Sequence, residues 1–195
     1  MPTLGGYLHE SAATLENSVT DLLEAAMRGA IEAAVAALAA GRPLLVCGNG
    51  GSASDAMHIA GELVGRYKRA RRGLNVIALS ANPAVLTAWA NDYDYESIFA
   101  RQVEAHGAAG GVLLALSTSG NSRNVLAALE TARTLGMTTI GMTGDGGGRM
   151  AALCDVLLPV ASRDTPHIQE VHMCLYHYFC DQIEERLAAE APPRS

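Results

Sequence analysis

The chain has 195 residues, of which 49% are hydrophobic and 17% are charged. This length suits one domain with a substantial core, and the composition excludes a disordered or low-complexity protein. The formal net charge of −6 at pH 7 argues against a general attraction to nucleic acid or to an anionic membrane, so an anionic ligand would need a local site.

The N-terminal stretch MPTLGGYLHES has no basic segment and no apolar core, so it does not look like a secretory signal. The most apolar helical stretch, residues 29–40, is interrupted by Glu32 and is too short to cross a bilayer. We therefore expect a cytoplasmic protein that does not bind membranes. The cysteines show no C-x-x-C spacing and stand among apolar residues, as reduced core thiols do; they are Cys47, Cys154, Cys174 and Cys180.

Two helices are predicted before the first strand, over residues 8–28 and 31–40, and a last long helix over residues 166–189, with Asp164 or Thr165 as its N-cap. Between them, short apolar runs alternate with segments of helical length, which is typical of strands buried on both faces of a parallel sheet. This alternation predicts an α/β fold, a three-layer αβα sandwich with a five-stranded parallel sheet. The apolar runs cover residues 43–47, 75–80, 111–118, 138–144 and 156–160.

We expect a single domain over residues 1–195, with N-terminal helices in residues 1–40, the sandwich in 41–190 and a loose tail in 191–195. In such a sheet, ligands bind at the carboxyl ends of the strands, where the loops gather at a topological switch point. Three of the four loops that follow the first four strands are rich in Gly, Ser or Thr. The four loops are GNGGSAS, SANPAV, STSGNSRN and TGDGGGR.

The first loop matches a dinucleotide-binding fingerprint, because Gly48, Gly50 and Ala53 fit G-x-G-x-x-[GA]. That fingerprint also requires an acidic residue at the end of the second strand. The second strand ends ALSAN, and the preceding RYKRARRG is basic. We therefore reject the dinucleotide interpretation and take the glycines to allow close approach of another polar ligand to the helix start.

The helix behind this loop carries His58 and Glu62 one turn apart on one face. An imidazole and a carboxylate at this spacing can share a zinc ion or cooperate in proton transfer. The same pair is common on ordinary helix surfaces, so the spacing alone leaves both interpretations open. The position about two turns after a ligand-type loop favours a functional pair.

The third loop carries hydroxyl side chains, a flexible Gly120 and the unpaired N–H groups of a helix start, which together indicate a phosphate site. The alternative is that Ser119 or Asn121 only caps the helix. Capping needs one such residue, whereas four hydroxyls are present. A Walker loop is excluded because no G-K-[ST] follows, which favours a phosphosugar. The hydroxyl residues are Ser117, Thr118, Ser119 and Ser122.

Other polar residues have open interpretations. On the last helix, Gln169 and His177 fall near one stripe, and His177 could be a core histidine, whereas His167 is expected to face solvent. Asn91 and Asp92, at a helix end, could bind sugar hydroxyls or form a turn. The basic residues between positions 66 and 72 are expected to form a solvated face.

Five segments together resemble the SIS (sugar isomerase) family, and within it the bacterial phosphoheptose isomerases, over nearly the whole chain. The segments are CGNGGSASDAMHIAGEL, TAWANDYDYESIFARQV, STSGNSRNVL, MTGDGGGRM and SRDTPHIQEVHMCLYH. The resemblance implies a flavodoxin-like sheet and the conversion of sedoheptulose 7-phosphate to D-glycero-D-manno-heptose 7-phosphate, an early step towards nucleotide-activated heptose. It also implies one zinc ion per subunit and a homotetramer with active sites at subunit interfaces, assembled with the help of residues 1–40.

The resemblance further implies roles for individual residues. Glu62 and His177 would be catalytic, and we expect Glu62 to be the base at carbon and His177 to exchange protons with the oxygens, while zinc polarises the carbonyl. The implied zinc ligands are His58, Glu62, Gln169 and His177. The implied substrate-binding residues are Asn49, Gly50, Gly51, Ser52, Glu62, Asn91, Asp92, Ser117, Thr118, Ser119, Ser122 and Gln169.

One geometric difficulty accompanies this assignment. Gln169 and His177 lie about 12 Å apart along a straight helix, so sharing one ion strains their reach. Converging side chains, a distorted helix or a neighbouring subunit would resolve it.

Two other functions stay open. One is a non-catalytic SIS protein that binds a replication initiator; there the positions of Glu62 and His177 are not kept, so their presence favours the enzyme. The other is a SIS isomerase of a different sugar phosphate.

Overall fold

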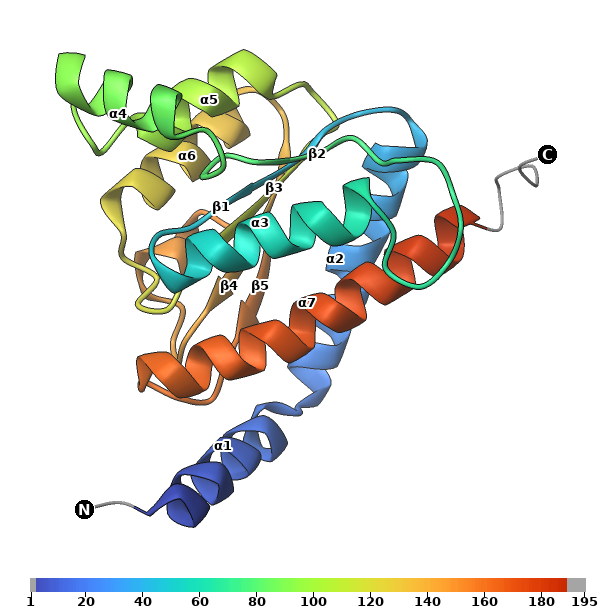
Figure 1. Ribbon diagram of the computed structural model, residues 1–195, viewed down its shortest axis with the longest axis vertical. Coiled ribbons are helices and arrows are strands. Elements are labelled where there is room, and N and C mark those ends of the chain that lie inside the picture. The colour runs from blue at the N-terminus through green and yellow to red at the C-terminus, as the bar shows by residue number, and fades with distance from the viewer. Residues whose placement is uncertain (1–2, 189–195) are drawn as a thin grey trace.

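The computed structural model describes residues 3–188, which form three layers around one parallel sheet (Figure 1). Its strands lie in the order β2-β1-β3-β4-β5, and every pairing is parallel. The α/β sandwich with a five-stranded parallel sheet is therefore confirmed, and each strand lies inside its predicted apolar run. The strands are β1 (Leu44–Cys47), β2 (Val76–Ala78), β3 (Val112–Ser117), β4 (Thr138–Thr143) and β5 (Val156–Pro159).

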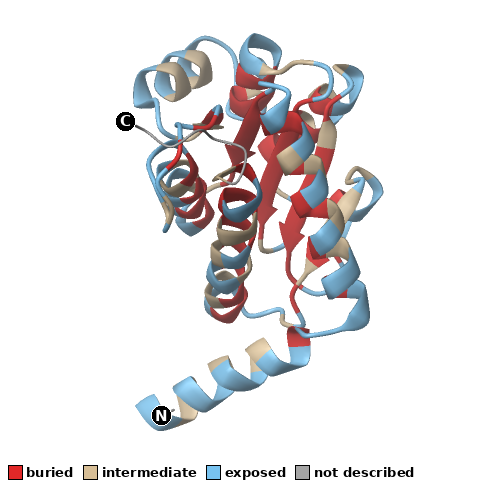
Figure 2. Ribbon diagram, turned by 90° about the vertical axis from the view of Figure 1, so that its right-hand side faces the viewer, coloured by how far each residue is buried: buried red, intermediate tan, exposed pale blue. Residues whose placement is uncertain are grey.

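Helices cover both faces of the sheet. One layer consists of α2 (Asp21–Ala39), α3 (Gly51–Val64) and α7 (Thr165–Ala188). The other contains α4 (Pro83–Asp92), α5 (Ile98–His106) and α6 (Arg123–Thr134), with the short 3-10 helix η1 (Gly148–Ala152). Figure 2 shows that the buried residues are concentrated on the strands and on the helix faces turned towards them.

The two faces of β3 explain why its sequence is apolar from Val112 to Leu116. Leu114 and Leu116 belong to the core on the α2-α3-α7 side, and Leu113 and Ala115 belong to the core on the α5-α6 side. Alternate side chains of a strand point to opposite faces, so a strand covered on both sides needs apolar residues at every position.

The predicted boundary between the N-terminal helices is wrong. The chain breaks after α1 (Leu4–Ser18) instead of near Gly29, because Thr20 caps α2 by accepting a hydrogen bond from the Leu23 N–H at 3.1 Å. Gly29 lies inside α2. A glycine there costs the helix about 1 kcal/mol of stability relative to alanine, but it does not end the helix. Helix α1 projects beyond the three layers (Figure 1) and packs against the start of α7, where the Tyr7 hydroxyl donates to Glu170.

Helix α7 begins at Thr165, one residue before the prediction, and the Asp164 carbonyl accepts from the Ile168 N–H at 2.9 Å. It ends at Ala188, so the predicted last residue and the tail at 191–195 lie outside the described residues. None of the helices in residues 3–188 is long and apolar enough to cross a membrane.

The cysteines are all free, as expected, but they do not share one environment. Cys47 and Cys180 are buried, and burial raises the pKa of Cys47 to about 12. Cys154 is partly buried and Cys174 is exposed on α7, so the prediction of a core thiol is wrong for Cys174.

The strand order places a topological switch point between β1 and β3. From β1 the chain continues to β2 on one side, whereas β3 pairs with β1 on the other side. The loops that follow β1 and β3 consequently leave neighbouring strands at the same edge of the sheet, where open α/β sheets bind ligands.

Candidate active site

A pair of asparagines joins the two loops at the switch point. The Asn49 side-chain amide donates to Asn124 Oδ1 at 2.9 Å, and the Asn124 amide donates back to Asn49 Oδ1 at 2.9 Å. The Tyr95 hydroxyl also donates to Asn49 Oδ1, at 3.1 Å. The sequence analysis missed Asn124 and Tyr95 as partners of Asn49, although both lie inside the polar motifs that it singled out.

The glycines of the first loop allow α7 to approach α3. Gly50 has φ 57° and precedes the first residue of α3. A Cβ atom at Gly51 would lie 2.5 Å from Gln169 Nε2. A side chain at position 51 would therefore displace Gln169, so this glycine places the Gln169 amide beside the loop.

The third loop presents hydroxyl groups at the start of α6. Ser117 Oγ lies 3.1 Å from Ser122 Oγ. Ser122 occupies the N-cap position, but within the described chain its side chain makes no capping hydrogen bond. Ser119 and Asn121 bond to each other instead of capping the helix, with the Asn121 amide donating to the Ser119 carbonyl at 2.7 Å. The loop thus places hydroxyl groups that do not cap α6 beside a positive helix end, as an anion site requires.

The glycine-rich segment after β4 packs against the backbone of this loop. Gly120 has φ 64°, and a Cβ atom there would overlap the Gly147 carbonyl. The Met150 N–H donates to the Gly120 carbonyl at 3.0 Å, and the Arg149 N–H donates to Asn121 Oδ1 at 3.1 Å. The glycines of TGDGGGR therefore allow two loops to pack backbone against backbone.

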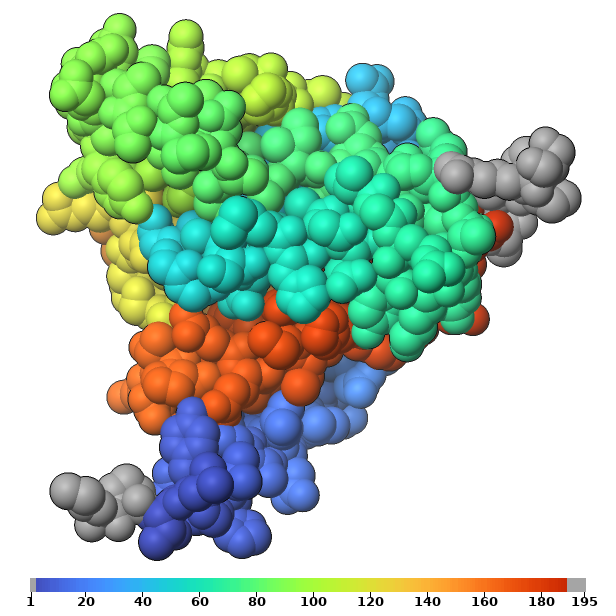
Figure 3. Space-filling model, in the orientation of Figure 1, coloured from blue at the N-terminus to red at the C-terminus, as the bar shows by residue number. Residues whose placement is uncertain are grey.

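His58, Glu62 and His177 form a cluster between α3 and α7, which lie side by side across one face of the molecule (Figure 3). His58 Nε2 lies 3.0 Å from Glu62 Oε1, and the ring centres of His58 and His177 are 5.1 Å apart. The side chains of His58 and Glu62 are 40% and 22% exposed, so the cluster is open to solvent. Burial, followed by the neighbouring His58, lowers the pKa of His177 and favours its neutral ring.

Gln169 lies at the other end of this helix pair. It contacts Gly51 at the start of α3, about 10 Å along that helix from His58. Two imidazoles and a carboxylate are ligand types that zinc accepts. However, no three His, Cys, Asp or Glu side chains in residues 3–188 are gathered closely enough to hold a metal ion. The chemistry of the predicted ligands fits zinc, but the described part of one chain does not gather them around a single point, and Gln169 lies about two helical turns from His58.

Asn91 and Asp92 lie in the last turn of α4, where the Asn91 amide donates to Asp92 Oδ1 at 2.9 Å. Both are exposed, and no hydrogen bond within residues 3–188 links them to the two loops. Asp92 also lines a surface depression of about 430 Å³ together with Trp89 and Arg101. A single chain therefore leaves these predicted sugar-binding residues facing outwards.

A buried carboxylate organises the basic segment that follows α3. Glu184 accepts hydrogen bonds from the backbone N–H groups of Tyr67, Lys68 and Arg69 at 2.9, 2.6 and 2.8 Å. The guanidinium of Arg71, fully buried, lies 3.3 Å from Glu184. The predicted solvated face is therefore wrong for Arg71.

This segment reaches the cluster in two places. The Tyr67 ring stacks on His177 with a centroid distance of 5.8 Å. Arg71 donates to the Glu62 carbonyl at 2.8 Å. The sequence offered no signal for the stacking of Tyr67 on His177, because Glu184, which holds the Tyr67 backbone, lies more than 110 residues away.

The structure also corrects two histidine assignments. His167 is buried beneath α1 instead of facing solvent, because Nδ1 lies 3.1 Å from Glu170 Oε2 and 3.2 Å from Ser11 Oγ. The core histidine on α7 is His172, which lies 3.3 Å from the Thr143 carbonyl and whose pKa burial lowers to about 4. His177 is only partly buried.

Comparison with known proteins agrees with this geometry. The SIS domain profile matches residues 6–144. The phosphoheptose isomerase of Crocosphaera subtropica is 55% identical over 152 residues, which cover 78% of each chain. That of Aliarcobacter butzleri is 50% identical over 170 residues, which cover 87% of this chain and 90% of the relative. The chain belongs to the phosphoheptose isomerase family.

Solved structures of the family share the whole architecture. The phosphoheptose isomerase from Neisseria gonorrhoeae has a TM-score of 0.87 and 39% identity, and the match covers 93% of this chain and 97% of the other. The one from Francisella tularensis has a TM-score of 0.89 and 36% identity, with coverages of 93% and 96%. Membership of this family makes the chain a phosphosugar isomerase.

Proposed function

We propose that the protein interconverts sedoheptulose 7-phosphate and D-glycero-D-manno-heptose 7-phosphate in the cytoplasm, an early step towards nucleotide-activated heptose. The observation that carries the proposal is the switch point, where the hydroxyl loop before α6 adjoins the loop of Asn49. Behind that loop, α3 carries the His58–Glu62 pair. A phosphate site, a polar sugar site and an acid–base pair therefore follow one another along neighbouring elements.

The third loop binds the phosphate in this proposal, because the Ser117 and Ser122 hydroxyls and the start of α6 offer donors without a side-chain cap. The sugar lies along the first loop. The phosphate ligands are Ser117, Thr118, Ser119 and Ser122. The sugar ligands are Asn49, Gly50, Gly51, Ser52, Asn91, Asp92 and Gln169.

Isomerisation moves a proton between two neighbouring carbons. Glu62 removes the proton from the carbon next to the carbonyl, which gives an enediol, and then returns it to the other carbon. His177 takes up and gives back the hydroxyl protons, a role that suits a ring whose pKa is lowered towards the neutral form. A zinc ion held by His58, Glu62, Gln169 and His177 would supply polarisation of the carbonyl.

A homotetramer with active sites between subunits is part of the proposal. It is supported by the distance between Gln169 and the His58 cluster, by the outward position of Asn91 and Asp92, and by apolar side chains left uncovered on α1 and α2. A second subunit that covers residues 1–40 would also complete the ligand sets. Among the described residues of this region, the exposed large apolar side chains are Leu4, Leu8, Val19 and Leu22.

Glu62→Gln tests the mechanism, because it removes the base and keeps the shape of the side chain. We expect a loss of at least about 100-fold in turnover of sedoheptulose 7-phosphate, since a positioned base contributes about 10²–10⁴-fold. Product formation is followed by NMR. Glu104→Gln, an exposed carboxylate on α5, is the matched control and should keep native activity.

Turnover of Glu62→Gln within a factor of two of the native rate would contradict the assigned base. If the native protein converts a hexose phosphate but not sedoheptulose 7-phosphate, the isomerase of another sugar phosphate is the correct function.

Removal of metal tests the cofactor. We expect dialysis against a chelator to lower the turnover, because the carbonyl loses its polarising cation, and added Zn²⁺ to restore it. Metal content is measured alongside activity. Full activity in protein that contains no bound metal would exclude the zinc assignment.

A further inference from the structure

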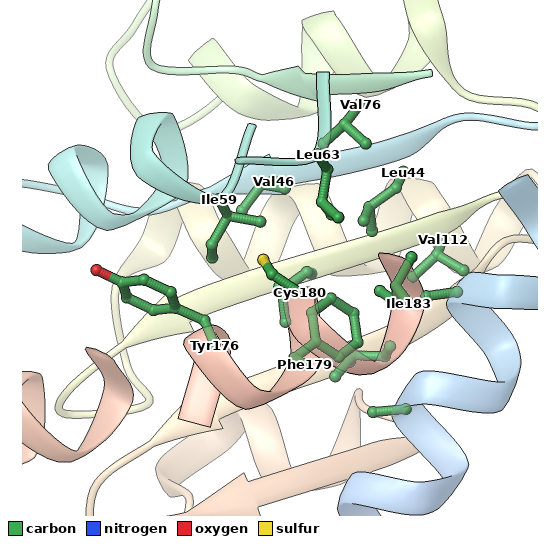
Figure 4. Close-up of a cluster of buried hydrophobic side chains, with 14 of the residues drawn as sticks. Leu44, Val46, Ile59, Leu63, Val76, Val112, Tyr176, Phe179, Cys180 and Ile183 are labelled. Atoms are coloured by element: carbon green, nitrogen blue, oxygen red, sulfur yellow. The ribbon is translucent and has the colours of Figure 1, made fainter. Parts of the chain in front are cut away.

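Tyr176 lies between the core and the His58–Glu62 pair. Its ring is fully buried, and Figure 4 shows the hydroxyl oxygen pointing away from the surrounding aliphatic side chains. The hydroxyl lies 2.9 Å from His58 Nδ1 and 3.4 Å from Asp55 Oδ1. These three side chains form a chain of polar groups that begins inside the core and ends at the cluster.

Asp55 determines where the hydroxyl proton lies. It is buried, its Oδ1 has the Tyr176 hydroxyl as partner, and its Oδ2 has no hydrogen-bond partner among the described residues. A carboxylate only accepts hydrogen bonds. The Tyr176 hydroxyl therefore donates to the Asp55 carboxylate, although burial raises the pKa of Asp55 and the 3.4 Å contact is longer than an ordinary O–H···O bond.

The proton position then sets the tautomer of His58. Because Tyr176 has one proton and directs it to Asp55, its oxygen accepts from His58 Nδ1–H. A neutral imidazole carries one proton, so Nε2 presents a lone pair. That lone pair faces Glu62 Oε1 at 3.0 Å, and two acceptors at this distance repel each other unless a cation or a proton lies between them.

We propose that Asp55 and Tyr176 are positioning residues that hold His58 in its Nδ1–H form, so that Nε2 and the Glu62 carboxylate face the same divalent cation. The inference rests on the metal site of the proposed function. Histidines that bind metals commonly donate their other N–H to a carboxylate, carbonyl or water. Here the N–H of His58 donates to the Tyr176 hydroxyl, and that hydroxyl in turn donates to the buried Asp55 carboxylate.

A substitution that removes the charge of Asp55 can reverse the direction of these hydrogen bonds. Asn has the same shape, but its amide can donate to the Tyr176 oxygen. Tyr176 would then donate to His58 Nδ1, and Nε2–H would donate to Glu62. Asp55→Asn should therefore close Nε2 to a metal ion without removing any ligand.

The test measures the affinity of metal-free protein for Zn²⁺ in competition with a chromophoric chelator. We expect Tyr176→Phe and Asp55→Asn each to weaken binding by about 10–100-fold, the range found when such outer partners are removed. Because the two residues act through one path, the double variant should lose no more than the larger single loss. Tyr178→Phe, an exposed tyrosine on the same helix, should bind as the native protein does.

Native affinity in either single variant, with the fold intact by circular dichroism, would overturn the proposal. So would additive losses in the double variant, because they would mean that the residues act separately.

The NMR signals of ¹⁵N-labelled histidine in metal-free protein give a readout that does not depend on metal. We expect the neutral His58 ring to carry its proton on Nδ1 in the native protein and on Nε2 in Asp55→Asn. An unprotonated Nδ1 in the native protein would overturn the inference. A protonated Nδ1 in a native protein that fails to bind Zn²⁺ would instead refute the metal site while leaving the positioning intact.

Discussion

Single residues set the shape of the loops at the switch point, and Gly120 is the clearest case. It combines a positive φ with a backbone approach to Gly147 that leaves no room for a Cβ atom. Ser117 and Ser122, on either side of it, hold their hydroxyls 3.1 Å apart. The conformation of this glycine therefore shapes the loop that carries the proposed phosphate donors.

Gly120→Ala tests this dependence. The added methyl group must push the loop away from Gly147, so we expect the KM for the sugar phosphate to rise at least tenfold. Gly110→Ala is a matched control, because Gly110 also has a positive φ but has nothing within 4 Å of the added Cβ. It should lose about 1–2 kcal/mol of unfolding free energy through the left-handed conformation alone and keep the native KM. An unchanged KM in Gly120→Ala would show that the loop does not hold the phosphate.

At the scale of elements, α7 organises both the site and the segment after α3. Glu184 binds three backbone N–H groups of that segment, and the segment in turn places Tyr67 on His177. A single helix thus carries a proposed catalytic histidine and the carboxylate that holds the loop packed against it.

Glu184→Gln should disrupt this arrangement. The variant leaves the buried Arg71 without its counter-charge, which typically costs about 3–5 kcal/mol of unfolding free energy. We expect a lower denaturation midpoint in urea and a reduced kcat, because Tyr67 loses its support beside His177. Glu185→Gln, which alters the neighbouring, largely exposed carboxylate, should change neither. Equal midpoints for the two variants would contradict the role of Glu184.

The same carboxylate makes stability depend on pH. Burial raises the pKa of Glu184, but the N–H groups of residues 67–69 and the charge of Arg71 outweigh burial, so the pKa lies below its ordinary value. A folded pKa below the unfolded value of about 4.3 stabilises the protein above about pH 4.3, and this contribution is lost as the pH falls through the folded pKa. We expect urea denaturation between about pH 7 and pH 3 to show this loss in the native protein and a flatter profile in Glu184→Gln.

At the scale of the whole molecule, the described chain leaves apolar surface on its N-terminal helices. Leu22 is 83% exposed and Leu8 is 57% exposed. Such side chains are suited to contact with further subunits, and α1, which packs on the start of α7, projects beyond the sandwich (Figure 1).

Leu8→Asp and Leu22→Asp should weaken assembly, because each would place an unpaired charge in an apolar interface. We expect light scattering to show a tetramer for the native protein and smaller species for the variants, with activity lost in parallel if the sites lie between subunits. Glu16→Gln, an exposed polar position on α1, should remain tetrameric. A fully active native monomer would contradict the shared site.

The sequence alone determined the five strands and their parallel α/β arrangement, and it supplied the residues of the proposed site. Apolar runs, turn glycines and hydroxyl-rich loops are local patterns, and they located all five strands, the loop of Asn49, the loop of Ser117 and the His58–Glu62 pair. Local patterns also misplaced the break between α1 and α2, because a threonine cap and a glycine are both plausible helix boundaries until packing selects one.

Only the tertiary structure decided which groups meet. The strand order brought Asn49 to Asn124, the packing of α7 set Glu184 against a segment more than 110 residues away, and Tyr176 came to lie between Asp55 and His58. Periodicity reports which face of an element is apolar, but it carries no information about which distant polar group will lie opposite. For that reason the sequence could not place the histidines of α7: His167 is buried beneath α1, His172 is in the core and His177 adjoins the proposed active site.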